Sequence, residues 1–284
     1  MDETTARTLC AMTTRLYAHE ANSFSETRQR PWAGWEAVLA AAGLQRAGAP
    51  QRLRVLDVAC GNMRFARFLS EALPETRLDM HALDNCPELV ACADTLPATC
   101  AVTFQRIDII EALLAGDGML QACVSHAAAV QPEQAAPDGG SPNSGVRFDL
   151  VVCFGFMHHV PGAALRTRLL AELAALLAPG GHLAVALWQF GDDARLARRA
   201  ADLTAEACAA HPELALEHGD YLLGWKDAQG LRRYCHCFDD DECERLAREL
   251  DGTARLAADF TDDGSGQRDA SRKAHNRYLV WRAA

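Results

Sequence analysis

Two patterns of apolar and polar residues take turns over residues 52–190, and they predict strands and helices in alternation. Short apolar runs predict buried strands, whereas apolar residues three or four positions apart predict amphipathic helices. The expected strands are residues 52–59, 78–83, 102–107, 148–154 and 182–188, and the expected helices are residues 63–73, 87–95 and 163–177. This order is typical of a doubly wound, Rossmann-like α/β sheet with parallel strands.

Two segments depart from the alternation. Residues 131–145 are rich in Pro, Gly, Ser and Gln, and they predict a flexible loop inserted before the fourth strand. Residues 192–250 are mostly helical in pattern and predict a helical cap after the fifth strand, and strand patterns return at 255–260 and 277–282. We expect one domain over 1–284, with a helical segment at 1–50, a cofactor-binding core at 51–191, the cap, and closing strands within 251–284.

The composition fits an ordinary globular enzyme. A chain of 284 residues with 49% hydrophobic residues can bury a sizeable core without covalent staples. No apolar run approaches the 18 residues of a membrane span, and the first 20 residues carry charges instead of a signal-peptide core. We therefore expect a cytoplasmic protein that does not enter the membrane.

Cysteine is unusually frequent, with 11 residues scattered along the chain. Several lie inside apolar runs, so reduced core thiols are expected in place of a disulfide framework. Cys235, His236, Cys237 and Cys243 lie close together in the sequence, but they contain no C-x-x-C pair and do not match the spacing of zinc sites. No metal is expected.

The charge is unevenly distributed. The net charge is -10, and residues 192–263, which include the cap, hold 18 acids against 9 bases. Residues 264–284 instead carry five bases, Arg268, Arg272, Lys273, Arg277 and Arg282, against Asp269. An acidic chain is a poor general binder of polyanions, so RNA binding would need a local arginine cluster or a basic partner.

The most informative segment is residues 55–63, VLDVACGNM, which leads from the first strand into a helix. In open parallel sheets, ligands bind at the carboxyl ends of the strands, and a helix N-terminus offers free N–H groups there. Asp57 is placed to receive a cationic ammonium group. Because this loop has no basic residue and contains Asp57, it would repel a pyrophosphate.

Two further acids follow the next two strands. Asp84 ends the second strand, where a carboxylate accepts hydrogen bonds from the two hydroxyls of a ribose. Asp108 follows the third strand, where it can accept from an adenine amino group. Three acids at successive strand ends suit a cofactor that carries an amine, a ribose and an adenine.

These residues resemble the class I S-adenosylmethionine-dependent methyltransferases. Their first motif, D-x-G-C-G-x-G, reads here as Asp57 to Met63, with Ala59 and Met63 replacing glycines, and residues 148–152 and 177–181 match further family segments. The resemblance implies a seven-stranded sheet that closes with an antiparallel hairpin, and S-adenosylmethionine as cofactor. The cofactor contacts expected from it are Asp57, Ala59, Cys60, Gly61, Asn62, Asp84, Asn85, Asp108, Ile109, Phe154 and Arg28.

A finer resemblance links the chain to the methyltransferases that esterify 5-carboxymethyluridine at the wobble position of tRNA. It rests on FSETR at 24–28 with PW at 31–32, on His158-His159, on Gly224-Trp225 and on RYCHCF at 233–238. Gly224 stands where that family tends to have proline, and Cys235 where it has a second tyrosine. The resemblance implies a tRNA carboxylate as substrate and leaves room for a small activating protein partner.

The acceptor decides which residues act in catalysis. A carboxylate is ionised at pH 7 and needs a cation to hold it, for which Arg233 and Arg28 are the candidates. A hydroxyl or amine needs a base, for which His158 or His159 is the candidate. Tyr234 either stacks on a base of the acceptor or packs the cap onto the sheet. Three hypotheses follow: a tRNA carboxyl methyltransferase, a methyltransferase of a small carboxylate or hydroxyl compound, and a non-catalytic cofactor-binding protein.

Overall fold

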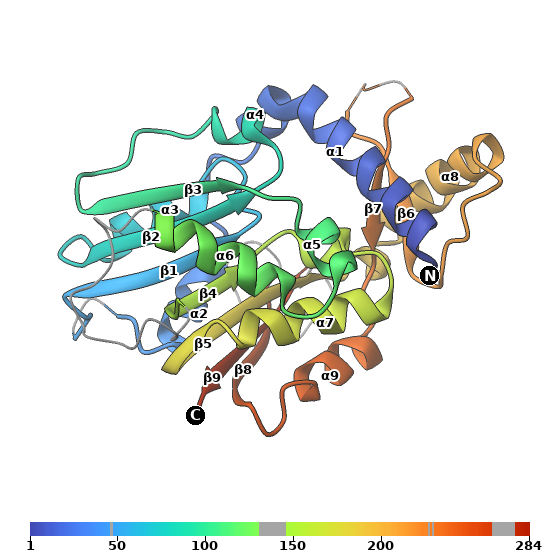
Figure 1. The fold of residues 1–284 in the computed structure, drawn as a ribbon. Helices are drawn as coiled ribbons and strands as arrows, with labels where there is room; N and C mark the ends of the chain where they lie inside the picture. The colour runs from blue at the N-terminus through green and yellow to red at the C-terminus, as the bar shows by residue number, and fades with distance from the viewer. Residues whose placement is uncertain (46–47, 131–145, 227, 229, 263–275) are drawn as a thin grey trace.

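The computed structural model describes residues 1–45, 48–130, 146–226, 228, 230–262 and 276–284. Its main feature is a seven-stranded sheet with the order β3-β2-β1-β4-β5-β9-β8 (Figure 1). The strands are β1 (Arg52–Val58), β2 (Arg77–Asp84), β3 (Cys100–Arg106), β4 (Phe148–Cys153), β5 (Leu177–Trp188), β8 (Ala254–Asp262) and β9 (Asn276–Ala283). Strands β1 to β5 pair in parallel, whereas β9 is antiparallel to both β5 and β8. The expected sheet and its closing hairpin are confirmed.

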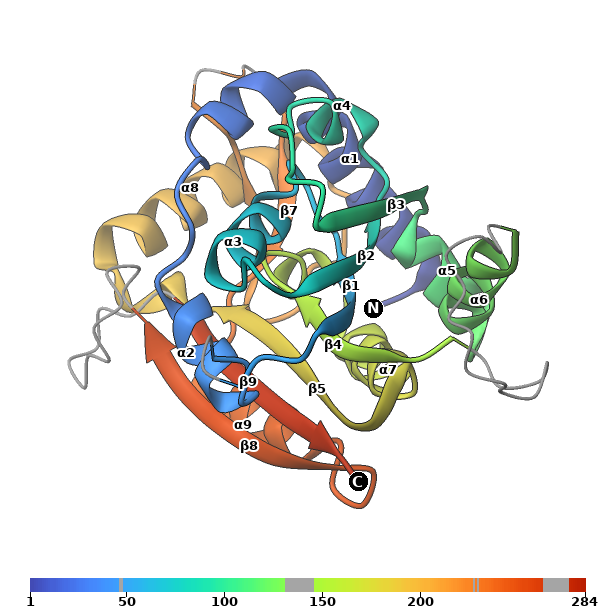
Figure 2. The same cartoon turned by 90° about the vertical axis from the view of Figure 1, so that its left-hand side faces the viewer.

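Helices cover both faces of the sheet (Figure 2). On one face lie α2 (Gly34–Ala41) and α3 (Arg64–Ala72), whose buried residues include Trp35 and Phe68. On the other face lie α5 (Ile109–Ala115), α6 (Met119–Val130), α7 (Ala163–Ala174) and α9 (Asp240–Arg248). This two-sided cover explains why the central strands are apolar on both faces.

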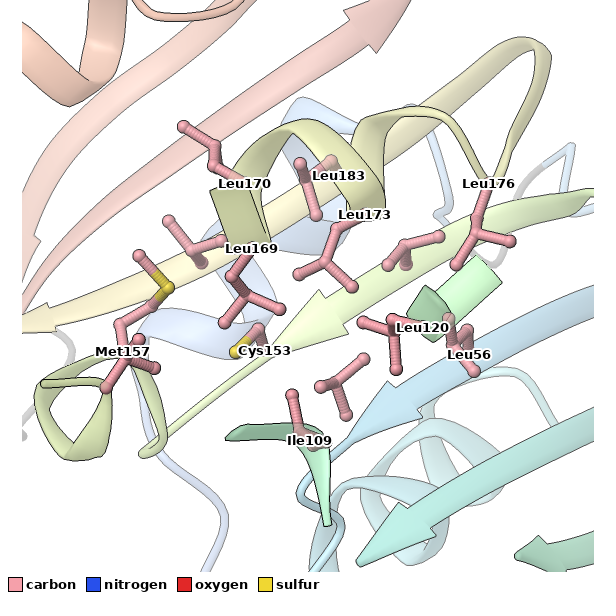
Figure 3. Close-up of a cluster of buried hydrophobic side chains, with 14 of the residues drawn as sticks. Leu56, Ile109, Leu120, Cys153, Met157, Leu169, Leu170, Leu173, Leu176 and Leu183 are labelled. Carbon is pink, nitrogen blue, oxygen red and sulfur yellow. The ribbon is translucent and has the colours of Figure 1, made fainter. Parts of the chain in front are cut away.

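The core under α7 fixes the strands that lead to the site. Leu169 and Leu173 of α7 face Leu56 of β1 and Leu183 of β5, and all four side chains are fully buried (Figure 3). Burying one such side chain contributes about 1.5–3 kcal/mol to folding. This packed core therefore holds the carboxyl ends of these strands in place.

A long N-terminal helix, α1 (Glu3–Glu26), crosses the sheet at the carboxyl ends of its strands (Figure 1). Asp2 caps it, since the Oδ1 atom accepts a hydrogen bond of 2.9 Å from the backbone N–H of Thr5. The helix packs against α5, against the short helix α4 (Pro87–Val90) and against β7 of the cap. None of the described helices is both long enough and apolar enough to cross a membrane.

The cap corrects one expectation, because it is not mostly helical. After α8 (Ala194–Ala210) it forms a two-stranded antiparallel sheet of β6 (Asp220–Leu223) and β7 (Arg233–His236), and it ends in α9. Strands of four residues are too short to show a clear alternating pattern. Their polar residues are buried by partners that lie far away in the sequence, which the local pattern cannot reveal.

Three boundaries also differ from the prediction. The helix expected at 87–95 ends at Val90, and the one expected at 163–177 ends at Ala174. The Pro-Gly-Gly segment at 179–181 lies inside β5 and does not simply stop the helix. A Cβ atom on Gly181 would lie 2.8 Å from the carbonyl oxygen of Phe148, so glycine is needed for close pairing with β4. The loop predicted at 131–145 and the bases Arg268, Arg272 and Lys273 lie outside the described residues.

Candidate active site

A cavity opens beneath α1 at the carboxyl ends of the parallel strands. Twelve of the predicted site residues line it: Arg28, Asp57, Ala59, Cys60, Gly61, Asn62, Asp84, Asn85, Asp108, Ile109, Phe154 and His159. His158, Arg233 and Tyr234 do not line it. All eleven residues predicted to contact the cofactor therefore line this one cavity, whereas only one of the four predicted catalytic residues does.

The loop between β1 and α3 has the backbone that the glycine motif requires. Ala59, Gly61 and Met63 have φ angles of 59°, 54° and 55°, in the left-handed region that favours glycine. A side chain there costs about 1–2 kcal/mol, and the loop keeps its shape despite Ala59 and Met63. Asn62 fixes the loop to the end of α1, because its Nδ2 atom donates to Ser25 Oγ at 2.9 Å.

Asp57 is a buried carboxylate that faces the cavity. It is 4% exposed, and within the described residues its oxygens have no hydrogen-bond partner. Burial, together with the nearby Asp84, raises the pKa of Asp57 to about 7. A buried acid without a partner is costly, and a cation in the cavity would stabilise its charged form.

Asp84 is buried as well, but the backbone holds it in place. Its Oδ2 atom accepts from the N–H of Gly61 and its Oδ1 atom from the N–H of Cys86, each at 2.8 Å. Burial raises the pKa of Asp84, although these N–H groups act against the shift. Each carboxylate oxygen keeps further acceptor capacity toward the cavity, as two ribose hydroxyls would need.

Asp108 already has three partners, one of which is Cys10 Sγ of α1 at 3.8 Å. Asp108 also caps α5, accepting a hydrogen bond of 3.1 Å from the backbone N–H of Glu111, and it accepts from Asn85 Nδ2 at 3.3 Å. Asn85 also donates to Thr14 Oγ1 of α1 at 3.0 Å. This network joins α1 to two strand ends, so α1 is part of the site on the side assigned to adenine.

A chain of hydrogen bonds lies at the other end of the cavity. Arg233 Nη1 donates to the hydroxyl of Tyr17 at 2.5 Å, and this hydroxyl is 2.9 Å from His159 Nε2. His159 Nδ1 is 2.6 Å from the carbonyl oxygen of Tyr234. Burial and the charge of Arg233 lower the pKa of His159 to about 3, so this imidazole is neutral.

Two arginines make this end of the cavity electropositive. Arg233 is 6% exposed, its Nε atom is buried without a partner, and no described carboxylate pairs with it. Its guanidinium carbon lies 5.7–5.9 Å from the ring centroids of Tyr17, Phe24, Trp188 and Trp225. Arg28 lies 3.8 Å from the ring of Phe24, and burial followed by the charge of Arg233 lowers the pKa of Arg28 to about 10. Such a site attracts an anion.

His158 and Tyr234 lie behind the cavity wall. Tyr234 is fully buried and its hydroxyl donates to Asp220 at 2.7 Å, so its ring packs the cap and does not face the cavity. His158 packs on Trp188 and His159, and burial lowers its pKa. Within the described residues, His158, His159 and Cys235 form a group of potential metal ligands. The bond of His159 Nδ1 to a carbonyl and the charge of Arg233 both oppose a cation there.

Sequence reasoning missed the residues that α1 contributes. Cys10, Thr13, Thr14 and Tyr17 line the cavity, although they belong to a helix more than 30 residues before the first motif. Their spacing fits an ordinary packed helix, so no local pattern marks them. All 11 cysteines are free thiols, as expected.

Comparison with known proteins shows the family and the fold of this chain. The sequence model of a family described as methyltransferase domain matches residues 25–250. A solved S-adenosylmethionine-dependent methyltransferase of Methanosarcina mazei is 14% identical, with a TM-score of 0.51 over 82% of this chain and 93% of that one.

Two further solved structures have the same fold. The DhpI complex with SAM and HEP is 16% identical, with a TM-score of 0.52 over 96% of this chain and 97% of the other. A Haloferax volcanii complex of the Trm112 methyltransferase activator with a methyltransferase gives 14% identity and a TM-score of 0.52, over 95% and 97% of the two chains. No curated protein matches the sequence.

Proposed function

Because this chain belongs to the methyltransferase-domain family and is an S-adenosylmethionine-dependent methyltransferase, we propose that it methylates a carboxylate oxygen of its acceptor. The observation that carries the proposal is Arg233, a buried guanidinium without a described carboxylate partner, next to Arg28 at the end of the cavity. A carboxylate of the acceptor would complete this pair of cations.

The cofactor fits the other end of the cavity. Asp57 would hold its ammonium group, since this carboxylate has no described partner of its own, and Asp84 would hold the ribose hydroxyls. Asp108 and Asn85 would contact the adenine, with Ile109 and Phe154 packing around it. When bound, S-adenosylmethionine supplies an electrophilic methyl group on a positively charged sulfur.

On the acceptor side, the chain's residues orient the nucleophile and exclude water. A carboxylate is already ionised at pH 7, so it needs alignment and charge compensation and does not need a base. The aromatic rings around Arg233 remove water, which strengthens an ion pair with the acceptor. His159, with its pKa lowered to about 3, is a poor base, and a hydroxyl or amine acceptor is therefore disfavoured.

We infer that the carboxylate belongs to 5-carboxymethyluridine in tRNA. Three segments that carry the sequence resemblance provide Arg28, His159 and Arg233. Arg28 and His159 line the cavity, and the Tyr17 hydroxyl links Arg233 to His159. A small activating protein belongs to this proposal, as in the Haloferax volcanii complex. A small-molecule carboxylate is the second candidate, because a net charge of -10 disfavours RNA.

Transfer of a radioactive methyl group tests the proposal. The enzyme, with and without a Trm112-type partner, is incubated with labelled cofactor and either bulk tRNA or a panel of small acids. Label on tRNA that alkali removes is expected, because methyl esters hydrolyse readily. Alkali-stable label on a nitrogen or hydroxyl oxygen would contradict carboxyl methylation, and cofactor binding without transfer to any acceptor would favour the non-catalytic alternative.

Neighbouring arginines provide a matched pair of variants. Arg233→Gln is expected to leave the Kd of the cofactor unchanged while turnover falls at least tenfold. Arg232→Gln is the control, because Arg232 pairs with Glu206 at 3.2 Å, whereas Arg233 has no described carboxylate partner and bonds to Tyr17. Equal loss of cofactor binding and turnover in Arg233→Gln would argue against its role in holding the acceptor.

A further inference from the structure

We propose that Tyr17 is a positioning residue that aims Arg233 and occupies the free lone pair of His159, and that it thereby restricts the enzyme to acceptors that arrive as anions. This inference rests on the proposed carboxyl methylation and adds the basis of its selectivity. Tyr17 lies on α1, far in the sequence from both partners, and its hydroxyl contacts both.

The directions of the hydrogen bonds follow from chemistry. The Arg233 guanidinium only donates, so the Tyr17 oxygen accepts from Nη1 at 2.5 Å. The carbonyl oxygen of Tyr234 only accepts, so His159 carries its proton on Nδ1, which lies 2.6 Å away. His159 Nε2 therefore has a lone pair, and it accepts the Tyr17 proton at 2.9 Å.

Both nitrogens of His159 are thus occupied in this chain of hydrogen bonds. For His159 to take a proton from an alcohol or amine, the Tyr17 hydroxyl would have to turn away. The resulting imidazolium would then be buried beside Arg233, a second cation. Neither change is required when the acceptor is already a carboxylate. The same hydrogen bonds therefore permit a carboxylate acceptor and oppose an alcohol or amine.

The Tyr17 hydroxyl also orients the guanidinium of Arg233. It is the only hydrogen-bond partner of this guanidinium among the described residues, and Arg233 Nε has none. An arginine held by one bond in a ring of aromatic side chains keeps its remaining donors available for a ligand. Without the Tyr17 hydroxyl, no hydrogen bond from the described residues would fix the guanidinium within its ring of aromatic side chains.

Tyr17→Phe isolates the hydroxyl from the ring. The ring is held edge-on by Phe24 and His159, at centroid distances of 4.8 and 5.5 Å, and phenylalanine preserves both contacts. Tyr221→Phe is the matched control, since Tyr221 lies on β6, touches Phe190 and does not line the cavity. Equal melting temperatures of both variants and the wild type would show that folding is intact.

The first measurement needs no acceptor. Nitrogen-15 NMR of His159 in the ligand-free enzyme is expected to show a neutral ring with the proton on Nδ1 from pH 5 to 9, and a shifted Nε2 signal in Tyr17→Phe alone. A proton on Nε2, a charged ring at pH 7, or no shift in Tyr17→Phe would overturn the assignment. This result stands even if the acceptor is not a carboxylate.

The second measurement compares two probes, the nucleosides 5-carboxymethyluridine and 5-hydroxymethyluridine. The wild type is expected to methylate only the first, and Tyr17→Phe to raise the KM for that probe about tenfold or more while the cofactor Kd changes less than threefold. In an Arg233→Gln background, Tyr17→Phe should add little. Methylation of 5-hydroxymethyluridine at a comparable rate, or equal loss of cofactor and acceptor binding in Tyr17→Phe, would refute the selectivity role. If neither nucleoside reacts, the NMR result alone decides the role of Tyr17, and the tRNA assay separately decides the acceptor.

Discussion

Two groups of buried charges lie on opposite sides of β7. They differ in whether each charge has an ion-pair partner. Behind the strand, Arg166 pairs with Glu242 at 3.0 Å, and His236 lies between Glu242 at 2.6 Å and Asp220 at 2.8 Å. On the side of Tyr17, which lines the cavity, Arg233 has no described ion-pair partner. Burial is similar in both groups, so burial alone does not identify a functional site.

The alternation of side chains along β7 creates this difference. Arg233 points toward Tyr17 and the cavity, whereas Tyr234 and His236, on the other side, join Asp220. One strand therefore carries a charge without an ion-pair partner on one face and a network of paired charges on the other. The unpaired charge suits a ligand, and the paired network holds in place the strand that presents Arg233.

The largest loss of stability is expected from breaking the paired network of Arg166, Glu242, His236 and Asp220. Arg166→Met should lower the free energy of unfolding by about 3–5 kcal/mol, because it removes the arginine from Glu242 Oε1 and from the Val160 carbonyl in a buried site and leaves Glu242 with His236 alone. Urea unfolding measures this change. The folded variant should keep the wild-type cofactor Kd, and a loss below about 1 kcal/mol would mean that the network contributes little.

At Asp57 we expect a substitution to raise the free energy of unfolding, in contrast to the loss expected at Arg166. The raised pKa of Asp57 means that its stabilising contribution is present at pH below about 4 and is lost as the pH rises through about 7. Asp57→Asn should therefore stabilise the ligand-free protein at pH 8 by about 1–3 kcal/mol, while weakening cofactor binding. Thermal unfolding with and without cofactor tests both effects, and a less stable ligand-free variant would contradict the interpretation.

Asp84→Ala should weaken cofactor binding by about 1–3 kcal/mol, because two ribose hydroxyls would lose a charged acceptor. Asp79→Ala is a suitable control: Asp79 lies on the same strand, is also buried, and pairs with Arg52 away from the cavity. Titration calorimetry gives both Kd values. Equal affinity in the wild type and Asp84→Ala would place the cofactor elsewhere.

The smallest effect on stability is expected at His236. Burial opposes its charged form, but the hydrogen bonds to Asp220 and Glu242 prevail and raise its pKa. Its contribution to stability is therefore complete below about pH 6.5 and is lost as the pH rises through the raised pKa. His236→Gln should remove about 1 kcal/mol of this pH-dependent stability, which urea unfolding at pH 6 and pH 9 measures.

The fold could be predicted from the sequence because its signals are local. The apolar runs of β1, β4 and β5 and the segment from Asp57 to Met63 depend on neighbouring residues in the chain. The position of two acids at the cavity could be predicted for the same reason: Asp84 is the last residue of β2, and Asp57 is the last but one of β1. The shape of the loop, despite Ala59 and Met63, needed the φ angles of the structure.

The acceptor side could be predicted only in part. Arg28, His159 and Arg233 were proposed from resemblance, but their linkage depends on Tyr17, which belongs to a helix that no motif marks. The hairpin of β6 and β7 was missed because the partners of its polar residues are distant in sequence, as Asp220 is from His236. Tertiary contacts, and not local preference, create this part of the site.

Proton release on cofactor binding tests most directly whether the unsatisfied charges of the cavity are ligand contacts. At pH 6, Asp57 with a pKa of about 7 is mostly protonated, and a cationic cofactor should displace its proton. Calorimetry in two buffers of different ionisation enthalpy should show proton release on cofactor binding in the wild type and markedly less in Asp57→Asn. Tight binding without proton release in the wild type would contradict the account.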